Sequence, residues 1–435
     1  MKKALCYLAL AVVTLPSFAS AADWSVYSTT LLGIEQRAVP GFADQTFAPA
    51  TQFFGADLNK IGDGNISMHM YGWGRVDLAD KSTNEGRTDG DLTYAYLDYR
   101  FPQANGEIKA GRFFINEGVA IEQIDGVSAR ADLKKGFTLS MFGGAPVKLD
   151  WSKNNKGDYI AGGRTSYRLA GILEVGVSGL YEGEVTLDPA TGKKGVRPMV
   201  GGDIWFSPHR TVEVAGHTFY NVFTGGVAEN SYLLTIKPLK VVTVTGVYND
   251  QRFKDYFIFS NMHSLFNPDN GGESKNFGGG VTWIVARPFE ITADYRHFKR
   301  TSDVNTDNNG DSDRYGVDAR LKLLDKRLRS GLAYHRSDGA SGFNSYDEVR
   351  GYCLYEISRY VGSIDAIGQF YRNSIYKRSN AFEVIASAGY HILPELALSG
   401  DVSYGQNPQF DEDLRGLLRL TYTINSKTAA KGAKK

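Results

Sequence analysis

The amino-acid sequence predicts an all-β fold, a transmembrane antiparallel up-and-down β-barrel of about twenty strands, with about 18–22 as the range. Segment after segment alternates apolar and polar residues with a period of two, which puts the apolar side chains on one strand face. These segments are joined alternately by short turns and by long polar loops. Glycine (49), tyrosine (25) and phenylalanine (24) are abundant, yet the sequence has no run of the ~20 apolar residues that a membrane helix requires.

The first 21 residues have the three parts of a secretory signal peptide. Lys2 and Lys3 form a charged beginning, residues 4–15 are apolar, and residues 19–21 form an Ala-Ser-Ala cleavage site. The apolar part is too short to cross a bilayer. We therefore expect an exported mature chain that begins at Ala22.

Charge and cysteine content exclude several classes of protein. The chain has 49 Lys and Arg against 48 Asp and Glu, which gives no support to a nucleic-acid partner. Removal of the signal peptide takes Cys6 with it and leaves Cys353 alone. A single cysteine excludes an internal disulfide and any multi-cysteine metal or haem site within the chain.

Residues 22–64 do not fit the repeating pattern. They contain one strand-like stretch at 24–34 and a second stretch, 42–55, rich in Phe, Ala and Thr. Three interpretations are open: a periplasmic extension, an inward plug, or an extra pair of strands. We place the N-terminal extension or plug at 22–64, the transmembrane barrel at 65–425, and a basic periplasmic tail at 426–435.

The segment 314–323 shows how the strands are recognised. Tyr315, Val317 and Leu321 share one face, whereas Asp318 and Arg320 share the other. In chain order the predicted strands are 65–78, 92–101, 107–115, 124–133, 137–141 with an extension, 158–169, 172–181, 197–206, 211–222, 231–236, 240–248, 275–285, 289–298, 314–323, 328–336, 346–357, 364–372, 381–391, 396–404 and 414–424.

The alternation of connections predicts the orientation. Barrels of this class have short periplasmic turns and long extracellular loops. The first and last connections between the predicted strands are both long. Because an even number of strands returns the chain to its starting side, both termini are expected in the periplasm of a Gram-negative bacterium, with the barrel in its outer membrane.

Aromatic residues are sorted to the strand ends. Such rings prefer the boundary between lipid and water, and two girdles of them are typical of membrane barrels. The tyrosines predicted beside long loops on the apolar phase are Tyr159, Tyr181, Tyr248, Tyr295, Tyr315, Tyr334 and Tyr404.

Charged residues are dense on the polar phase, which is tolerable at membrane depth only where a wall faces water or protein. Most of these charges are expected to bridge neighbouring strands. Both signs are common, so ion preference is open, with a slight lean towards anions. The predicted lumen-lining residues are Arg130, Asp132, Arg164, Arg168, Asp294, Arg296, Arg314, Asp318, Arg320, Arg415 and Arg419.

The long connection at 249–274 is unusually apolar. Its length allows it to fold inward as a constriction, and its aromatic side chains would equally suit a surface that contacts a partner. The candidate constriction residues are Phe253, Tyr256, Phe257, Phe259 and Phe266.

One external loop resembles the opening of a calcium-binding loop. Its possible ligands are Asn305, Asp307, Asn309, Asp311 and Asp313. However, Gly316 stands where such a loop has its bidentate glutamate, and no helices flank it. A solvated surface loop is therefore the favoured interpretation, with calcium as the alternative. We expect no other cofactor.

The sequence predicts no enzyme. The seven histidines are scattered, with neither an HExxH motif nor a GxSxG motif. His217 and His335 fall on the inward phase, yet no catalytic partner can be assigned to either from the sequence. A wall position is the more common role for such a histidine than that of a base.

The signal peptide, the alternating strands and two short stretches, 111–114 (GRFF) and 124–130 (IDGVSAR), resemble porin-type barrels of Gram-negative outer membranes. In particular they resemble the porin-like proteins of metal-reducing bacteria. That resemblance implies, for some members, a barrel that sheathes a multihaem cytochrome in an electron-transfer conduit. This chain lacks a CxxCH motif, so any haem would belong to a partner, and a lysine-rich tail replaces the terminal Phe of many porins.

The expected function is that of an outer-membrane porin, a passive diffusion channel for small polar solutes or ions. The alternative is a barrel scaffold around a multihaem cytochrome. Expected partners are outer-membrane lipid and the permeating solutes, with cytochromes under the alternative and homo-oligomers left open.

Overall fold

The computed structural model describes residues 23–38, 45–62, 64–79, 87–147, 157–188, 193–256, 272–301 and 309–426. Among these residues, no helix is both long and apolar enough to cross a membrane. The strands are β1 (Asp23–Ala38), β2 (Gln45–Phe47), β3 (Pro49–Ile61), β4 (Ile66–Asp77), β5 (Thr88–Phe101), β6 (Gly106–Glu117), β7 (Ala120–Asp132), β8 (Phe137–Pro146), β9 (Tyr159–Leu169), β10 (Leu173–Asp188), β11 (Lys193–His209), β12 (Val212–Asn221), β13 (Gly226–Leu239), β14 (Val242–Arg252), β15 (Glu273–Ala286), β16 (Phe289–Thr301), β17 (Gly310–Leu323), β18 (Leu328–Gly339), β19 (Tyr346–Ile357), β20 (Tyr360–Ile375), β21 (Arg378–Leu393), β22 (Leu396–Asn407) and β23 (Phe410–Asn425).

Within the described residues, helix is confined to single turns. The short α-helix α2 (Phe253–Tyr256) follows β14. The 3₁₀ turns are η2 (Gln103–Asn105), η3 (Lys134–Gly136) and η6 (Gly342–Asn344).

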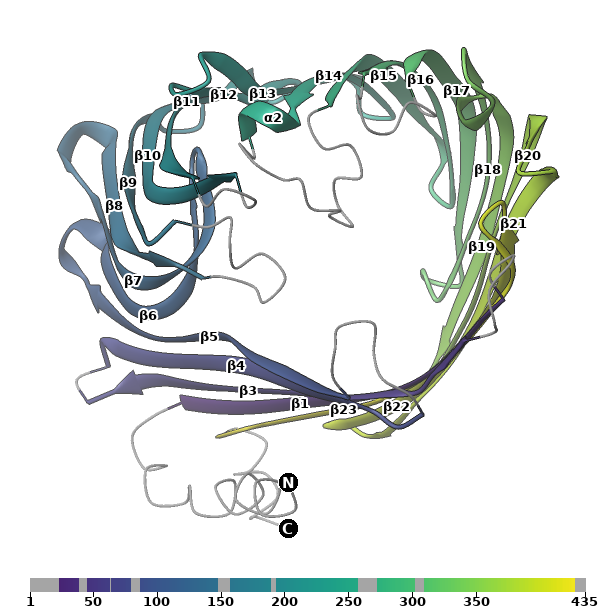
Figure 1. The fold of residues 1–435 in the computed structure, drawn as a ribbon, viewed down its shortest axis with the longest axis horizontal. Helices are drawn as coiled ribbons and strands as arrows, with labels where there is room; N and C mark the ends of the chain where they lie inside the picture. The colour runs from purple at the N-terminus through teal and green to yellow at the C-terminus, as the bar shows by residue number, and fades with distance from the viewer. Residues whose placement is uncertain are drawn as a thin grey trace.

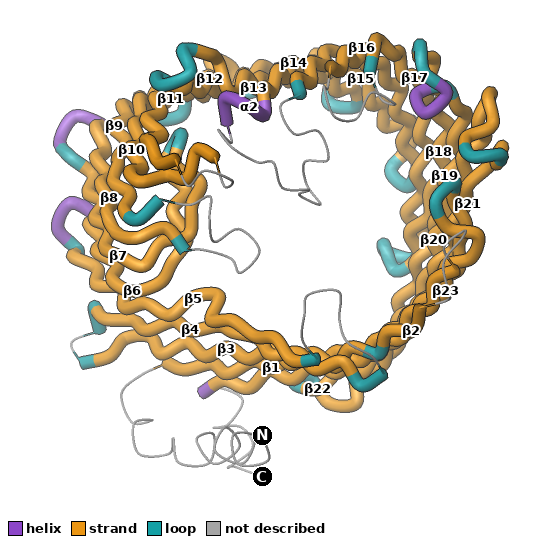
Figure 2. Tube along the Cα trace, viewed as in Figure 1, coloured by secondary structure: helices purple, strands orange, loops and turns teal. Residues whose placement is uncertain are grey.

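The sheet is closed. From β3 onward each strand pairs antiparallel with the next, and β1 pairs with β23 from Ser25↔Asn425 to Ala38↔Glu412 as well as with β3. The three-residue β2 pairs with the upper part of β1, in line with β3, so the ring contains 22 strands. Closure gives every strand of the ring a partner on both sides, the condition for a sheet to exist in hydrocarbon, although β5 and β6 pair only from Ala95↔Arg112 to Phe101↔Gly106. Figures 1 and 2 show the resulting ring.

Every one of the predicted strands is present, as β4 to β23, and the all-β barrel class is confirmed. The strand count was low by two, because residues 22–64 contribute β1 and β3 to the wall. An extra pair of strands is thus the interpretation that agrees with the structure, instead of an extension or plug, and the barrel begins at Asp23 and not at residue 65.

The reason for this error lies on the outward phase of β1 and β3. Ser28, Thr30 and Gln52 occupy positions where lipid-facing strands usually carry apolar residues. They satisfy one another, since the Thr30 hydroxyl donates to Gln52 Oε1 (2.6 Å) and Gln52 Nε2 donates to Ser28 Oγ (2.7 Å). The period-two signal is therefore interrupted although the strands form.

The connections separate a short-turn end from a long-loop end. Because the number of strands in the ring is even, β1 begins and β23 finishes at the same, short-turn end. The alternation in length is less strict than the sequence suggested. At the long-loop end, β20 and β21 are joined by Tyr376 and Lys377 alone, both with positive φ (48° and 69°), as in a tight two-residue hairpin. Gly118 and Val119 alone join β6 to β7.

The outer face is apolar and open. Val177 and Leu332 are 66% and 62% exposed, and large exposed apolar side chains recur around the ring. All seven tyrosines that we predicted beside the long loops are exposed on this face. Three of them also bond an aspartate on the following strand, from Tyr295 to Asp313, from Tyr315 to Asp338 and from Tyr334 to Asp347 (2.7, 2.8 and 2.6 Å). An exposed band of this kind is what a lipid-facing wall requires.

Candidate functional site

The inner wall of β14 to β19 forms an open, charged recess of about 770 Å³. It is built by alternation, since every second residue of these strands faces the same side. Five of the predicted lumen residues line it together: Asp294, Arg296, Arg314, Asp318 and Arg320.

The charges in this recess are paired across strands. Arg314 lies 3.3 Å from Glu348, and Arg320 and Lys322 each lie 3.4 Å from Glu290. Arg350 also pairs with Asp365 on the next strand, at 3.1 Å. These side chains remain partly exposed, so each pair contributes at most about 1 kcal/mol and together they keep the recess wettable.

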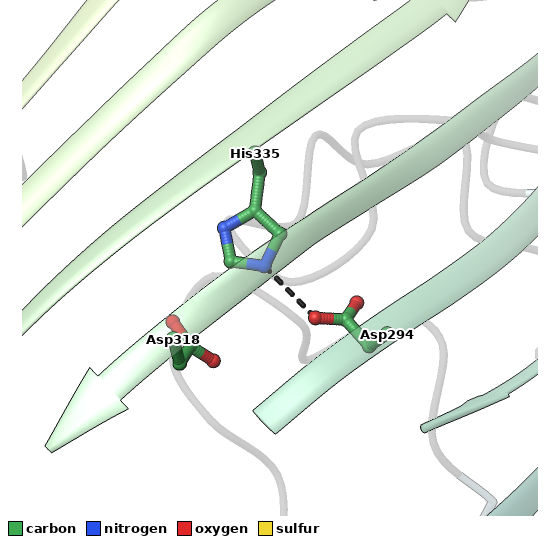
Figure 3. A group of neighbouring side chains, drawn as sticks. All are labelled: Asp294, Asp318 and His335. Carbon is green, nitrogen blue, oxygen red and sulfur yellow. Dashed lines mark hydrogen bonds and ion pairs between the residues drawn. The ribbon is translucent and has the colours of Figure 1, made fainter. Parts of the chain in front are cut away.

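His335 reaches across a strand within this recess (Figure 3). Its Nε2 lies 2.9 Å from Oδ2 of Asp294, although β17 separates the two residues' strands. Gly316 stands between them in the register, and a Cβ there would lie 2.4 Å from the imidazole Cδ2. The glycine therefore provides the space that the ring occupies. Asp318 completes a group whose ligand atoms lie within 4.8 Å of one another.

The other predicted lumen residues lie in two further sectors. Arg164 is bound by Asp203 (2.6 Å) and Glu174 (3.2 Å), and Arg168 by Glu174 (2.7 Å). Asp132 accepts hydrogen bonds from Asn105 and Thr138, both 2.9 Å long, and Arg130 stands opposite Ser140 in the register. Near the closure of the ring, Arg415 pairs with Asp413, and Arg419 lies 3.9 Å from Asp401. The structure thus spreads the predicted set around the wall instead of gathering it at one point.

One side of the barrel folds in on itself, a feature that sequence reasoning missed. The β6–β7 hairpin tip rests on β10, where the backbone N–H of Val119 donates to Ser178 Oγ (2.9 Å). The ribbon curls inward here, between β6 and β11 (Figure 1). A buried apolar cluster fills the fold: Phe113, Ile115, Val119, Ala120, Ile124, Phe142, Ile160, Leu180, Met199, Phe219 and Ala228. The sequence signal was available, because these strands carry apolar residues on both phases near the long-loop end.

A buried arginine and two glutamates hold the strands of this infolded region together. Arg197 on β11 binds both Glu182 on β10 (2.7 Å) and Glu122 on β7. The Arg197 and Glu182 side chains are only 9% and 2% exposed. The backbone N–H of Gly157 donates to the other Glu182 oxygen at 2.7 Å. Because the β7 and β11 strands are not neighbours in the sheet, Glu122 and Arg197 hold the folded wall together across it.

The aromatic connection after β14 is described only at its start. Phe253 and Tyr256 bound α2, which packs beside β12 and β13, with Asn221 Nδ2 donating to the Asp255 carbonyl (2.7 Å). Phe257, Phe259 and Phe266 lie outside the described residues. The inward constriction that we predicted for this connection therefore stays a prediction.

The calcium prediction falls partly outside the described part of the chain. Asn305 and Asp307 are not described, whereas Asn309, Asp311 and Asp313 are. Asp313 accepts hydrogen bonds from Tyr295 (2.7 Å) and pairs with His297 Nδ1 (2.9 Å), so its carboxylate already has protein partners.

His217, one of the two histidines considered for catalysis, stands beside Glu229, with Nε2 3.3 Å from the carboxylate. A glutamate on the next strand is a wall partner for a histidine and does not by itself make a catalytic base. Its ring also stacks on Phe219, with the ring centres 4.3 Å apart.

A row of stacked aromatic rings crosses the inward phase of β1, β3, β4 and β5. Tyr71 lies at its centre, with ring centres 5.9, 6.1 and 5.7 Å from those of Tyr27, Phe53 and Tyr94. Tyr96 extends the row. Cross-strand aromatic pairs stabilise a sheet, and the edges of these rings add an amphipathic strip to the inner wall.

No protein-family model matches the chain, and no curated protein matches it either. Solved structures share its fold. A mutant of the ferric enterobactin receptor PfeA of Pseudomonas aeruginosa is 11% identical with a TM-score of 0.55, covering 92% of this chain and 80% of that one. OccAB2 of Acinetobacter baumannii is 10% identical with a TM-score of 0.43, covering 92% and 98%. The P pilus usher translocation pore PapC is 10% identical with a TM-score of 0.47, covering 93% and 99%. At such identities the likeness to PfeA supports the barrel fold alone.

Proposed function

We propose that this chain is an outer-membrane channel through which small polar solutes or ions diffuse passively. One observation carries the proposal: a closed ring of strands has an apolar, exposed outer face and an inner wall lined by paired charges of both signs. A wall of this kind is stable at membrane depth where the interior is wet. The chemistry of the inner wall suits transport, and the described residues of this wall offer no assembled catalytic group.

The mechanism follows from the arrangement of the inner wall. Partly exposed arginines and carboxylates replace part of the hydration of a passing solute. Because these charges have both signs, they suit polar solutes in general and select neither cations nor anions. The infolded strands β6 to β11 take space from the interior on one side. Solutes would then pass along the open side, past the recess of β14 to β19.

Orientation belongs to the same proposal. Both described ends of the ring lie at the short-turn end, which is the periplasmic end in barrels of this class. The long-loop end, with its exposed tyrosines and Tyr–Asp bonds, would face outward. The signal peptide predicted at residues 1–21 would deliver the chain to this membrane.

The number of strands supports a second candidate function, that of a sheath around a partner protein. Barrels of 16–18 strands leave an aqueous channel, whereas 22-stranded outer-membrane transporters hold a plug. This ring has 22 strands, so its interior is wide enough to sheathe a partner. Under this alternative the partner is a multihaem cytochrome, and the haem belongs to that partner because the chain has no CxxCH motif.

Single-channel recording of the purified full chain in planar bilayers tests the proposal. A passive channel gives stable conductance steps at every holding potential of either sign. A silent protein that purifies together with haem would support the sheath. A silent protein without haem would contradict both functions, while heat-dependent migration on a gel verifies in each case that the barrel has folded.

A further inference from the structure

We infer that the inner wall binds one divalent transition-metal ion, of which Zn²⁺ is the reference, between Asp294, Asp318 and His335. These three residues lie on the consecutive strands β16, β17 and β18, and Figure 3 shows their side chains converging. One imidazole nitrogen and two carboxylate oxygens form a ligand set that zinc and its neighbours accept, with water in the remaining position.

The distances fit a shared metal ion. Two ligand atoms bound to tetrahedral zinc at about 2.0–2.1 Å lie roughly 3.3 Å apart. His335 Nε2 and Asp294 Oδ2 are 2.9 Å apart, so these two atoms are already close to that spacing. All three ligand atoms lie within 4.8 Å of one another. Asp318 would have to close by roughly 1.5 Å, which a small rotation of its side chain supplies.

The neighbouring arginines leave both aspartates available. Arg314 is closer to Glu348 (3.3 Å) than to Asp294 (3.8 Å). Arg320 is likewise closer to Glu290 (3.4 Å) than to Asp318 (4.0 Å). Among the described residues, Asp318 has no shorter polar partner than this. Its carboxylate therefore has only this one distant partner, although it faces a recess lined with charged side chains.

The imidazole is held in place before any ion arrives. The His335 side chain is only 7% exposed, and Gly316 leaves the space across which it reaches Asp294. Fixed ligands reduce the ordering that binding would otherwise require. The arginines beside the outer carboxylate oxygens would then orient the two aspartates in the way that second-shell groups orient ligands. The site depends only on the folded wall and not on whether the lumen conducts.

Calorimetric titration of the full chain with Zn²⁺ tests the site, on protein without a histidine tag and freed of metal by a chelator. The variants are Asp318→Asn and His335→Gln, which keep side-chain size and polarity. The matched control is Asp401→Asn, which removes a carboxylate of another lumen sector, 3.9 Å from Arg419. Heat-dependent gel migration checks the folding of each variant.

We expect one Zn²⁺ per chain for the unmodified protein and for Asp401→Asn, and a loss of affinity of about tenfold or more in the other two variants. Absence of saturable binding to the unmodified chain, or equal affinity in all four proteins, would overturn the site. Should one variant fail to fold, Co²⁺ titration of the unmodified chain decides. Visible absorption typical of mixed nitrogen and oxygen ligation supports the site, and the spectrum of the hydrated ion alone contradicts it.

Discussion

Between β6 and β19 the wall has an infolded half, strands β6 to β12, and an open half, strands β14 to β19, and both show the same alternation on their outer face. Their inward phases differ. The infolded half has Phe113, Phe142 and Leu180 facing inward near the long-loop end, all buried. The open half has Arg314 and Asp318 on its inward phase, where they line the recess. The inner phase therefore decides whether a stretch of barrel wall stays extended around the lumen or folds onto itself.

The same difference determines how much an ion pair contributes to the stability of the fold. In the open half, Arg320 is nearly half exposed and pairs with Glu290 at 3.4 Å, so water screens the interaction. In the infolded half, Arg197 is almost completely buried between two glutamates. Removing one member of a buried group leaves uncompensated charge, which costs far more than the loss of a screened pair.

The largest expected effect comes from replacing the buried arginine. We expect Arg197→Met to lower the free energy of unfolding by about 3–5 kcal/mol, because Glu122 and Glu182 are then left buried, close together and both charged. The measurement is a urea titration of the folded barrel in lipid vesicles, followed by tryptophan fluorescence.

The matched control in the open half is Arg320→Met, for which we expect a change of about 1 kcal/mol or less. Equal losses in the two variants would remove the distinction between the halves. A small loss in both would show that water reaches Arg197, in contrast to the burial described above.

The second test compares two leucines that both face inward. Leu180 on β10 is buried in the apolar cluster, whereas Leu233 on β13 is exposed on the inner wall. We expect Leu180→Ala to cost about 3 kcal/mol, from lost burial and the cavity left behind. Leu233→Ala is expected to change stability by roughly 0.5 kcal/mol, as at other exposed sites. The same urea titrations measure both, and a similar cost at the two positions would mean that the infolded cluster does not exclude water.

Much of this fold could be predicted because the outer face obeys one rule. Every strand from β4 to β23 was found from alternation, since lipid contact requires apolar residues at every second position. The rule failed at β1 and β3, where Ser28 and Gln52 face outward and satisfy each other. Alternation is therefore sufficient evidence for such a strand, but a strand can form without it.

The site was harder to predict, because alternation assigns a face and not a partner. It placed Asp294 and Asp318 on the inner wall, yet it could not show that His335 reaches Asp294 across Gly316. That contact depends on cross-strand register, which the sequence of β17 alone does not fix. The infold is a similar case, since Glu122 and Arg197 lie 75 positions apart in the chain and on strands that are not paired.

The smallest expected effect concerns the rim of the open half, where the described residues of β14 to β19 contribute nothing to the buried apolar cluster. There the Tyr315 hydroxyl donates to Asp338 on the next strand at 2.8 Å. We expect Tyr315→Phe to lower the free energy of unfolding by about 1 kcal/mol, the usual net value of such a bond. Tyr248→Phe is the control, because within the described chain that exposed hydroxyl has no partner, and its removal should leave stability unchanged within the error of the titration. If both substitutions were silent, the row of Tyr–Asp bonds would contribute nothing, and the open half would depend on its backbone pairing alone.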